Sequence, residues 1–362
     1  MKIINVVGTR PNFIKIAPLI DEMRNHDEIT QLLVHTGQHY DKEMSKFFFD
    51  DLGIPKPDIN LGIGSVSDVE QTARIMLEFE KILLKEKPDL VVVVGDVNST
   101  LAAALTAVKR GIKVAHVESG LRSFDRTMPE EFNRILTDHV ADFLFITEES
   151  ANKNLLNEGI GKNKIFFVGN VMIDSLLRHM EKAKQSKILS KLKLEKNNYA
   201  VLTLHRPSNV DSRESLEHVL EILNEIQKKI KIVFPVHPRT LKNIENFGLA
   251  EIIKKQKNII LTGPVGYLDF MNLMINSKFV LTDSGGIQEE TTVLGVPCIT
   301  MRNNTERPVT VEQGTNLLVS TDKNKIIETC NKLIKGTHFK GRIPQLWDGK
   351  AAKRIVDVIL KC

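Results

Sequence analysis

The segment LVVVVGD (90–96) is continuously apolar until it ends in glycine and aspartate. An uninterrupted apolar run of this length is typical of a strand that is buried on both faces of a parallel sheet. The segment before it, DVEQTARIMLEFEKILLKEK (68–87), has apolar residues at helical spacing and charged residues on the opposite face. An amphipathic helix that leads into a buried strand predicts an α/β fold.

The same alternation continues along the chain in both directions. Further short apolar runs occupy 3–8, 32–37, 114–119, 143–147 and 165–170 in the first half, and 199–205, 231–238, 258–264, 279–284, 297–301 and 316–320 in the second. Regular strand–helix alternation implies right-handed crossovers and doubly wound parallel sheets. Because these runs predict more strands than one ordinary sheet holds, we expect two sheets of about six strands each.

The length of 362 residues also favours two domains, because one hydrophobic core rarely supports such a chain. We predict an N-terminal Rossmann-like domain over 1–180 and a C-terminal Rossmann-like domain over 199–345. The lysine-rich segment 181–198 between them is expected to be a solvated helix and linker. Residues 346–362 have the pattern of one last amphipathic helix, which we expect to pack back on the N-terminal domain.

Composition excludes several classes of protein. The net charge of +5 is too small and diffuse for nucleic-acid binding, although it suits an anionic substrate. The three cysteines are widely spaced and form no CxxC pattern, which disfavours a disulfide framework and a structural zinc site. Since the N-terminal apolar run is too short for a signal peptide and no run is long enough to span a membrane, we expect a cytoplasmic protein.

Polar residues gather where the predicted strands end. The ends are Gly8-Thr9-Arg10, Gly95-Asp96, Glu118-Ser119-Gly120, His205-Arg206, His237-Pro238 and Asp283-Ser284-Gly285-Gly286. In open parallel sheets, ligands bind beyond the carboxyl ends of the strands. If the two predicted sheets face each other across a cleft, all of these residues surround one site.

The stretch FVLTDSGGIQEE (279–290) has the features of a phosphate-binding turn. Gly285 and Gly286 let the backbone approach a ligand closely, and the N-terminus of the helix that follows favours negative charge. Ser284 supplies a hydroxyl donor. Glu289 and Glu290 either complement the helix dipole or, in one case, accept from a ribose diol, and the residues alone leave both interpretations open.

GTRP (8–11) forms a second strand-to-helix turn that is not a GxGxxG motif. The fingerprint of a dinucleotide is therefore absent, and we expect no nicotinamide cofactor. Arg10 at this turn suits a phosphate or pairs with a nearby acid. Lys15, further into the helix, faces the same cleft or points to water.

Three carboxylates lie near this predicted phosphate site. Asp96 and Glu118 end strands, although Asp96 is also a candidate N-cap, and Glu130 stands at a helix start, where acids are common. Three carboxylates beside a phosphate indicate proton transfer. His205 and His237 each end a strand of the second half, and two such histidines favour a function over a structural role.

Several motifs together resemble the non-hydrolysing UDP-N-acetylglucosamine 2-epimerases. They are GTRPNFIKIAPL, GQHYDKEM, GDVNSTLAAAL, HVESGLR, MPEEFNR, LTDSGGIQEE and NNTERPV, and they follow in this order along nearly the whole chain. The resemblance implies the two-domain glycosyltransferase-B-like fold, a UDP-sugar substrate and a homodimer. It implies no cofactor and no metal.

The resemblance also implies roles for individual residues. Asp96, Glu118, Glu130 and His205 match catalytic positions, and Arg10, Lys15, Arg134, Phe270, Ser284, Gly285, Gly286, Glu290 and Arg307 match positions that bind the UDP-sugar. Glu290 matches the position that binds the ribose, and Phe270 matches a position in the uracil pocket. A second, activating UDP-GlcNAc in bacterial members uses positions that match Gln38, His39, Arg74, Arg206 and His237. Departures at Asp41, Ser119 and Pro207 leave this second site and the identity of the sugar open.

The implied chemistry fits these residues. Carbon 2 of an N-acetylhexosamine carries no activating carbonyl, so direct deprotonation and reprotonation would be too slow. Transient oxidation is excluded as well, because it requires a hydride carrier. The remaining route eliminates UDP to a 2-acetamidoglucal and adds it back after a proton reaches the opposite face. We assign proton transfer to Asp96 and Glu118, positioning or a shared role to Glu130, and phosphate binding or assisted departure to His205.

Four alternatives remain open from the sequence. The chain could act on a related 6-deoxy or uronic acid UDP-sugar, hydrolyse UDP-GlcNAc to N-acetylmannosamine and UDP, transfer the sugar to an acceptor, or sense the nucleotide sugar without turning it over. The carboxylate cluster disfavours the last two, because neither transfer nor binding alone requires several groups that move protons.

Overall fold

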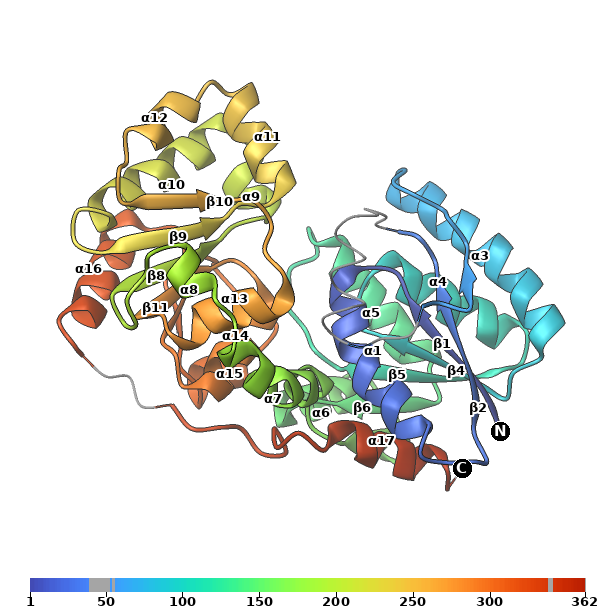
Figure 1. The fold of residues 1–362 in the computed structure, drawn as a ribbon. Helices are drawn as coiled ribbons and strands as arrows, with labels where there is room; N and C mark the ends of the chain where they lie inside the picture. Colours follow the sequence, from blue (N-terminus) through green and yellow to red (C-terminus); the bar gives the residue numbers. More distant parts are fainter. Residues whose placement is uncertain (39–52, 54–55, 338–340, 362) are drawn as a thin grey trace. The chain divides into compact units, whose positions relative to one another are not determined.

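The computed structural model describes residues 1–38, 53, 56–337 and 341–361. The chain divides into two compact units, which are coloured along the sequence in Figure 1. Unit 1 comprises Met1–Arg178 and Gln345–Cys362, and unit 2 comprises His179–Pro344. Each unit contains one parallel sheet, as the alternation of apolar runs and amphipathic helices predicts.

The sheet of unit 1 has seven strands in the order β3-β2-β1-β4-β5-β6-β7, all parallel. The strands are β1 (Lys2–Val7), β2 (Thr30–His35), β3 (Ile59–Asn60), β4 (Leu90–Val94), β5 (Lys113–Ser119), β6 (Phe143–Ile146) and β7 (Ile165–Phe167). The strand order reverses between β1 and β4, and ligands of such sheets bind at the carboxyl side of this switch point.

Helices pack against the central strands of unit 1. They are α1 (Arg10–Met23), α3 (Asp68–Glu86), α4 (Asn98–Lys109), α5 (Pro129–Val140), α6 (Glu149–Asn157), α7 (Val171–Lys184) and α17 (Ala351–Ile359), with a short 3-10 helix at Lys162–Lys164. Both α1 and α4 contact β1 and β4. All five residues of β4 are buried, which explains why this strand is continuously apolar.

The C-terminal segment belongs to unit 1. Figure 1 shows α17, in red, beside α1, and the two helices are in contact. The buried side chain of Trp347 donates from Nε1 to the carbonyl of Thr147 at 2.9 Å. The carboxylate of Asp174 on α7 accepts from the backbone N–H groups of Ala351 (3.1 Å) and Ala352 (2.7 Å), so a buried side chain from another helix satisfies the first turn of α17.

Replacing Asp174 by alanine should destabilise unit 1. The change leaves two N–H groups of α17 without their partner, and each such loss costs about 1–3 kcal/mol. Urea unfolding should therefore show a larger loss for Asp174→Ala than for Asp322→Ala, which removes an exposed N-cap from a helix of unit 2. Equal losses for the two variants would contradict the buried role of Asp174.

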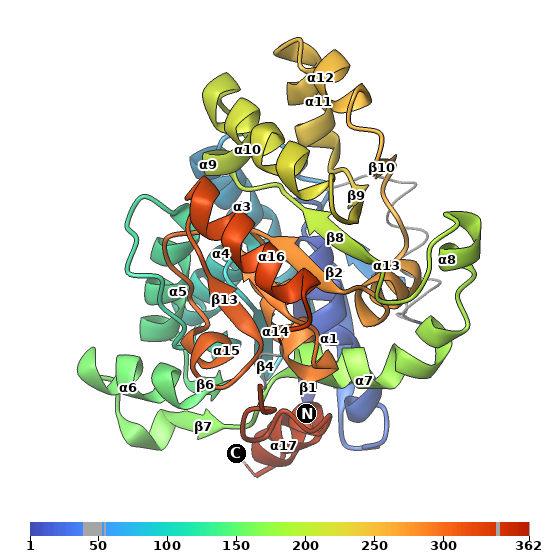
Figure 2. The ribbon, with the colours of Figure 1, turned by 90° about the vertical axis from the view of Figure 1, so that its left-hand side faces the viewer.

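The sheet of unit 2 has six parallel strands in the order β10-β9-β8-β11-β12-β13. The strands are β8 (Tyr199–Thr203), β9 (Lys231–Pro235), β10 (Ile259–Thr262), β11 (Phe279–Thr282), β12 (Cys298–Thr300) and β13 (Asn316–Leu318). The helices are α8 (Ile188–Lys191), α9 (Pro207–Val210), α10 (Arg213–Ile226), α11 (Pro238–Asn246), α12 (Ala250–Lys254), α13 (Tyr267–Ile275), α14 (Gly285–Leu294), α15 (Pro308–Glu312) and α16 (Lys323–Ile334). Figure 2 shows this unit from the side of α16 and β13. Its switch point lies between β8 and β11.

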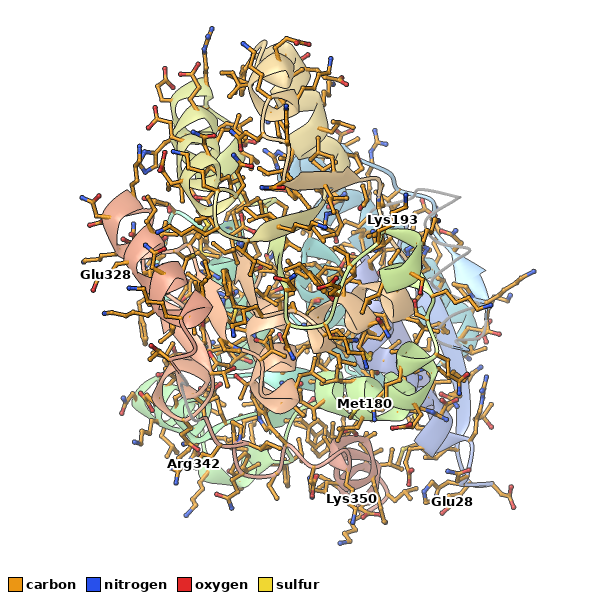
Figure 3. The ribbon with its side chains drawn as sticks, turned by 60° about the vertical axis from the view of Figure 1, so that its left-hand side comes forward. Glu28, Met180, Lys193, Glu328, Arg342 and Lys350 are labelled. Carbon is orange, nitrogen blue, oxygen red and sulfur yellow. The ribbon has the colours of Figure 1, made fainter. Side chains whose placement is uncertain are left out.

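Each unit has its own hydrophobic core, and polar side chains cover the outside. Phe79 and Val91 are buried in the core of unit 1, and Phe234 and Phe279 are buried in that of unit 2. Charged side chains such as Lys193 are exposed, as Figure 3 shows. Among the described residues, no helix combines the length and the apolar character that crossing a membrane requires.

Candidate active site

Unit 1 places two carboxylates at the carboxyl ends of neighbouring strands. Asp96 is the second residue after β4, and Glu118 is the next-to-last residue of β5, the strand that pairs with β4. Arg134 on α5 donates to Asp96 Oδ2 from Nη2 (2.7 Å) and Nε (3.1 Å). Lys15 on α1 lies 2.8 Å from Glu118 Oε1 and 2.7 Å from Oε2, and both side chains are buried. Each carboxylate therefore faces a cation at the edge of the sheet where ligands bind.

The backbone of Glu118 adopts a conformation that glutamate rarely takes. Its φ is +70°, and the pairing of β5 with β6 is irregular between Val117 and Ser119. A non-glycine residue in the left-handed region costs about 1–2 kcal/mol and persists only where its surroundings hold it. The buried contact with Lys15 is one such constraint. This local strain supports a functional role for the Glu118 carboxylate.

The carboxylate of Asp96 pairs with arginine and does not cap α4. The N-cap of that helix is Val97, and no side chain caps it. Asn133 on α5 donates to the backbone carbonyl of Asp96 at 2.9 Å and to Asn98 Oδ1 at 3.1 Å. The capping interpretation of Asp96 is therefore wrong, because α5 holds both its backbone and its side chain.

The two glutamates at the start of α5 have different environments. Glu131 is buried and accepts from the N–H groups of Ser123 (3.0 Å) and Phe124 (2.9 Å) and from Arg134 Nη1 (2.6 Å). Glu130, the predicted site residue, is half-buried on the preceding position. Glu131 therefore anchors the loop between β5 and α5, and no sequence pattern distinguishes this role from that of Glu130.

The turn from β1 to α1 is closely packed. Asn12 accepts from the N–H groups of Gly8 and Thr9, both at 3.1 Å, and donates to the carbonyl of Val94 at 3.0 Å. A Cβ atom at Gly8 would lie 2.0 Å from Ser99 Oγ, so only glycine fits there. The side chains that hold this turn thus also tie β1 to the end of β4.

Two of the residues predicted for a second nucleotide-sugar site, Gln38 and Arg74, lie in the described part of unit 1 and have separate partners. Gln38 is buried and its Oε1 accepts from the N–H (3.2 Å) and Oγ (2.6 Å) of Ser99. Arg74 is exposed on α3 and pairs with Glu70 of the same helix. His39 lies outside the described residues. Arg10, predicted to bind phosphate, is half-buried at the first position of α1.

Unit 2 forms the predicted phosphate-binding turn at the end of β11. Ser284 is the N-cap of α14 and uses no side-chain hydrogen bond for capping. A Cβ atom at Gly285 would lie 2.6 Å from Arg307 Nη1, so the absence of a side chain makes room for the guanidinium. Arg307 is buried and pairs with Glu289 at 2.7 Å and with Glu306 at 3.2 Å.

The glutamates of α14 are separated by their partners. Glu289 pairs with Arg307, whereas Glu290 accepts from the hydroxyl of Tyr267 on α13 at 2.9 Å. Both carboxyl groups are buried, so neither simply complements the helix dipole from the surface. Phe270, one turn further along α13, is half-buried against the core of unit 2.

Asp283 organises the loop that carries His205. Its carboxylate accepts from the N–H groups of His205 (3.0 Å) and Arg206 (2.9 Å) and lies 2.9 Å from the ring Nδ1 of His205. Burial raises the pKa of Asp283, but the bonds to His205, to the Arg206 N–H and to Asn209 outweigh burial and hold that pKa below its usual range. Asp283 is therefore a carboxylate that orients His205 at the switch point of the sheet.

The remaining two residues predicted for the second nucleotide-sugar site lie in unit 2. Nδ1 of His237 accepts from the N–H of Arg239 at 3.2 Å and so caps α11, which is a structural role. The ring centroids of His205 and His237 are 6.2 Å apart. Nη2 of Arg206 lies 3.5 Å from Oε1 of Glu306. His205, Arg206 and His237 thus gather at the carboxyl ends of β8 and β9.

Comparison with known proteins agrees with this geometry. Residues 21–360 match the family model described as UDP-N-acetylglucosamine 2-epimerase. The chain belongs to the UDP-N-acetylglucosamine 2-epimerase family. Its fold superposes with a TM-score of 0.93 on the Methanocaldococcus jannaschii UDP-GlcNAc 2-epimerase, whose crystal structure contains UDP-GlcNAc and UDP, at 46% identity and with 100% of both chains covered.

One further relative and one structure that shares only the fold help to delimit the family. The UDP-2,3-diacetamido-2,3-dideoxy-D-glucuronate 2-epimerase of Pseudomonas aeruginosa is 42% identical over 365 residues, which is 100% of both chains. The lipopolysaccharide outer core galactosyltransferase WaaB has a TM-score of 0.56 at 13% identity over 100% of this chain and 99% of that one, and so shares the fold alone. The predicted family and the glycosyltransferase-B-like fold class are confirmed, and the chain is an isomerase of this family.

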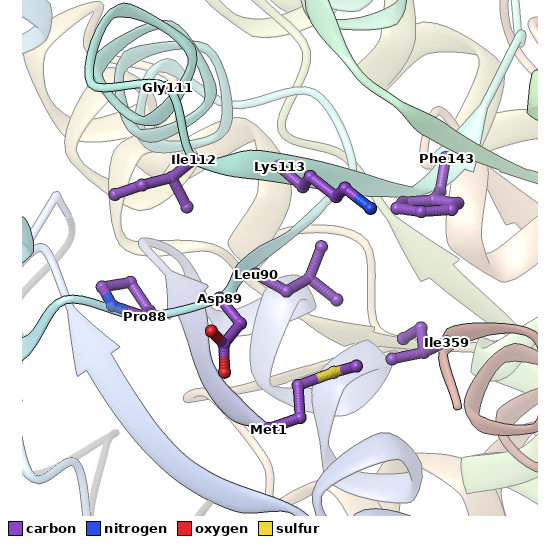
Figure 4. A pocket seen from close by; sticks show the side chains of 9 residues that line it. All are labelled: Met1, Pro88, Asp89, Leu90, Gly111, Ile112, Lys113, Phe143 and Ile359. Carbon is purple, nitrogen blue, oxygen red and sulfur yellow. The ribbon is translucent and has the colours of Figure 1, made fainter. Parts of the chain in front are cut away.

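A cavity in unit 1 lies away from these residues. Figure 4 shows it at the amino ends of the strands, where Asp89, Leu90, Lys113 and Phe143 line it together with Met1. Its volume is about 510 Å³, but the strand ends that carry Asp96 and Glu118 are at the opposite edge of the sheet. Within the described ranges, no group of three or more His, Cys, Asp or Glu side chains is placed to hold a metal ion.

Glu290 should make the stability of this epimerase family member depend on pH. Burial raises the pKa of Glu290 from 4.5 to about 7, although the Tyr267 hydrogen bond lowers it; the charge of Glu289 raises it further. Because the folded-state pKa is the higher one, the contribution of Glu290 to stability is full below pH 4.5 and is lost as the pH rises through 7.

The loss from this one group corresponds to about 3 kcal/mol. Urea unfolding of the nucleotide-free protein at pH 5 and pH 8 should show it, and Glu290→Gln should remove most of that difference. Glu251→Gln, which changes an exposed glutamate of unit 2, serves as the control. An unchanged pH difference in Glu290→Gln would contradict the assignment.

Proposed function

We propose that this chain interconverts UDP-N-acetylglucosamine and UDP-N-acetylmannosamine by eliminating UDP and adding it back. The observation that carries the proposal is the pair of carboxylates at the ends of β4 and β5, Asp96 and Glu118, each held by a buried cation. Two carboxylates fixed in this way are suited to moving protons, as an epimerisation requires.

Proton transfer at carbon 2 must be coupled to bond breaking at carbon 1. One carboxylate of unit 1 takes the proton from carbon 2 while the bond between carbon 1 and the phosphate oxygen breaks, which leaves a 2-acetamidoglucal and UDP. A proton then reaches carbon 2 from the opposite face, and UDP adds back to carbon 1. Asp96 and Glu118 serve these two steps, and Glu130 positions the sugar or shares one of them. Arg134 and Lys15 hold the carboxylates ready and contact the sugar.

UDP must stay bound while it is detached from the sugar. The residues of unit 2 at the end of β11 are suited to this, because the N-terminus of α14 and the guanidinium of Arg307 both favour a diphosphate. Ser284, Gly285 and Gly286 supply donors at the same turn. Arg10 of unit 1 stays a proposed phosphate ligand. Glu290 accepts from the ribose, and Phe270 contacts the uracil.

His205 assists the departure and return of UDP. The carboxylate of Asp283 at its Nδ1 orients the ring, and the side chain of His205 is 42% exposed, so its other nitrogen is accessible to a ligand. An imidazole N–H at this position stabilises the negative charge that develops on the leaving phosphate. Neither a metal nor a redox cofactor has a role in this scheme.

A second candidate substrate is a UDP-2-acetamido sugar with a carboxylate at carbon 6. The 42% identity with the P. aeruginosa glucuronate 2-epimerase over the full chain supports it, since the chemistry at carbons 1 and 2 is the same. A hydrolysing 2-epimerase remains the alternative reaction. It would release the free sugar.

Proton NMR in deuterated water separates these possibilities. Incubation with UDP-GlcNAc should place deuterium at carbon 2 of both UDP-sugar epimers. Free N-acetylmannosamine would indicate hydrolysis. If the spectrum of UDP-GlcNAc stayed unchanged and the protein turned over only the uronate analogue, the second candidate would be the substrate. Epimerisation without uptake of deuterium would contradict the elimination route.

A second UDP-GlcNAc that activates the enzyme stays a proposal for Gln38, Arg74, Arg206 and His237. The placement of Arg206 and His237 beside His205 supports it, whereas Gln38 is engaged with Ser99. A sigmoidal dependence of rate on UDP-GlcNAc concentration, lost in Arg206→Ala, is the expected sign. Hyperbolic kinetics in the wild-type protein would exclude this activation.

We also propose a homodimer, and an apolar surface of unit 1 supports it. Leu77 and Leu84 on α3 are 63% and 49% exposed, and Leu136 on α5 is 50% exposed. Since α4 packs against both α3 and α5, these side chains extend over one helical layer. A patch of this kind on a water-soluble surface marks an interface.

Light scattering tests this surface. The double variant Leu77→Asp/Leu136→Asp should shift the molar mass of the protein from dimer to monomer at micromolar concentration. Leu241→Asp, which charges an exposed leucine of unit 2, should leave the mass unchanged. A wild-type protein that is already monomeric would contradict the proposal.

A further inference from the structure

Two buried side chains, those of His116 and Asp138, contact each other next to the carboxyl ends of β4 and β5 in unit 1. His116 is on β5, two residues before Glu118, and its side chain is completely buried. Its Nδ1 is 2.7 Å from Asp138 Oδ1, and its Nε2 is 2.8 Å from the carbonyl oxygen of Gly95. Both ring nitrogens therefore have oxygen partners at hydrogen-bond distance.

The two partners fix the orientation of the ring. A carbonyl oxygen can only accept, so Nε2 of His116 donates to Gly95. The second oxygen of Asp138, Oδ2, receives hydrogen bonds from the N–H of Gly120 (3.0 Å) and from Nη1 of Arg122 (2.7 Å). Burial raises the pKa of Asp138, but His116 and Arg122 outweigh burial and hold that pKa below its usual range. The Asp138 carboxylate therefore binds His116 through Oδ1 and the loop after β5 through Oδ2.

Asp138 extends this contact network toward α6. Its partner Arg122 also contacts Glu158, the C-cap of α6, with Nε 2.8 Å from Oε1 and Nη2 2.7 Å from Oε2. The side chains of His116 and Asp138 are fully buried, so the loss of one partner leaves a buried polar group of the other without its hydrogen bond, which is costly.

The pair joins the two backbone segments that carry the proposed acid–base residues. The carbonyl bound by His116 belongs to Gly95, next to Asp96, and the N–H bound by Asp138 belongs to Gly120, two residues after Glu118. Both glycines have positive φ, +70° and +77°. A Cβ atom at Gly120 would lie 2.7 Å from the carbonyl oxygen of Ala151, so this turn has no freedom to shift toward α6.

We propose that His116 is a positioning residue that, together with Asp138, holds the strand ends bearing Asp96 and Glu118 at the separation that proton transfer at carbon 2 requires. This inference rests on the proposed function of those two carboxylates. His116 touches neither the substrate nor the reacting atoms. Because a misplacement of about 1 Å in a catalytic group can cost about 100-fold in rate, a tie of this kind has a large effect on turnover.

The hydrogen bond between His116 and Gly95 is tested first and does not depend on activity. In protein labelled with nitrogen-15 at histidine, Nε2 of His116 should carry a hydrogen that exchanges slowly with water, because its acceptor is the buried carbonyl oxygen of Gly95. The signals are assigned by their absence in His116→Gln. An Nε2 without a bound hydrogen would overturn the proposal.

The positioning role is tested by separating turnover from binding. In His116→Gln the side chain can no longer bond Asp138 and Gly95 at once, so kcat should fall about 100-fold. The Kd for UDP, measured by calorimetry, should change less than about threefold, because the proposed UDP contacts lie mainly in unit 2. The control is Asp142→Asn, which weakens a hydrogen bond to the N–H of Val114 at the amino end of β5 and should keep its kcat at temperatures where it is folded.

The double variant His116→Gln/Asp138→Asn guards against simple misfolding. It removes the whole buried pair, and such replacements restore stability more often than the removal of one partner does. It should recover much of the melting temperature lost in His116→Gln while remaining slow. Recovery of kcat along with the melting temperature would show a purely structural role and overturn the proposal. If the wild-type protein did not epimerise UDP-sugars at all, the proposed function would fail while the NMR result on His116 still stood.

Discussion

The Asp96→Asn and Glu118→Gln variants are each expected to turn over about 1,000-fold more slowly than the wild-type protein, with the affinity for UDP nearly unchanged. Loss of a general acid or base typically costs 10²- to 10⁴-fold, and the amide has the shape of the carboxyl group but cannot exchange a proton. The contacts with Arg134 and Lys15 hold both side chains in place in the nucleotide-free protein.

The two variants also separate the two faces of the sugar. If Asp96 and Glu118 act on opposite faces, each variant should slow deuterium uptake from one epimer more than from the other. Asp142→Asn is a suitable control, because this carboxylate accepts from the N–H of Val114 at the far end of the same sheet. Wild-type turnover in either amide variant would show that the altered residue does not move the proton.

Gly285→Ala is expected to weaken UDP binding by about 10- to 100-fold. The added Cβ would lie 2.6 Å from Nη1 and 3.1 Å from Cζ of Arg307, so the guanidinium must move. The same Cβ would approach Glu306 Oε1 to 3.3 Å, which limits where the arginine can go. Loss of one charge-assisted hydrogen bond to a phosphate costs about 1.5–3 kcal/mol, which corresponds to this range of Kd.

Calorimetric titration with UDP measures this effect. Gly263→Ala is the matched control, because a Cβ atom there would meet no heavy atom within 4 Å and its backbone conformation is open to other residues. Gly263→Ala should bind UDP as the wild-type protein does. Equal affinities for UDP in both variants would show that Arg307 and the turn at Gly285 do not contact the diphosphate.

The fold followed from the sequence where burial imposes a pattern. The run at 90–96 became β4, and its complete burial is the reason that no polar residue interrupts it. The seventh strand of unit 1, β3, escaped prediction because Ile59–Asn60 is too short to show any periodicity. The role of Asp174 in holding the C-terminal helix depends on contacts 177 residues away, which no local pattern reveals.

The candidate site could be predicted from the sequence where an ionisable side chain lies at the end of a strand. Asp96 and Glu118 were identified in this way, since a carboxylate is unusual at the end of a buried strand. His116 and Asp138 were missed, because within their strand and helix they look like ordinary polar residues until the fold brings them together. Asp283 is among the predicted strand-end residues, but its role in orienting His205 depends on a contact between residues 78 positions apart, which no local pattern reveals.

Positional isotope exchange tests the central claim, that UDP stays bound while its bond to carbon 1 breaks. In UDP-GlcNAc labelled with oxygen-18 at the bridge between carbon 1 and the β-phosphorus, the detached phosphate can rotate before the sugar returns. Phosphorus NMR should then show the label moving into non-bridging positions at least as fast as epimerisation occurs. Epimerisation with the label kept entirely in the bridge would contradict a detached UDP whose phosphate rotates, and with it the proposed mechanism.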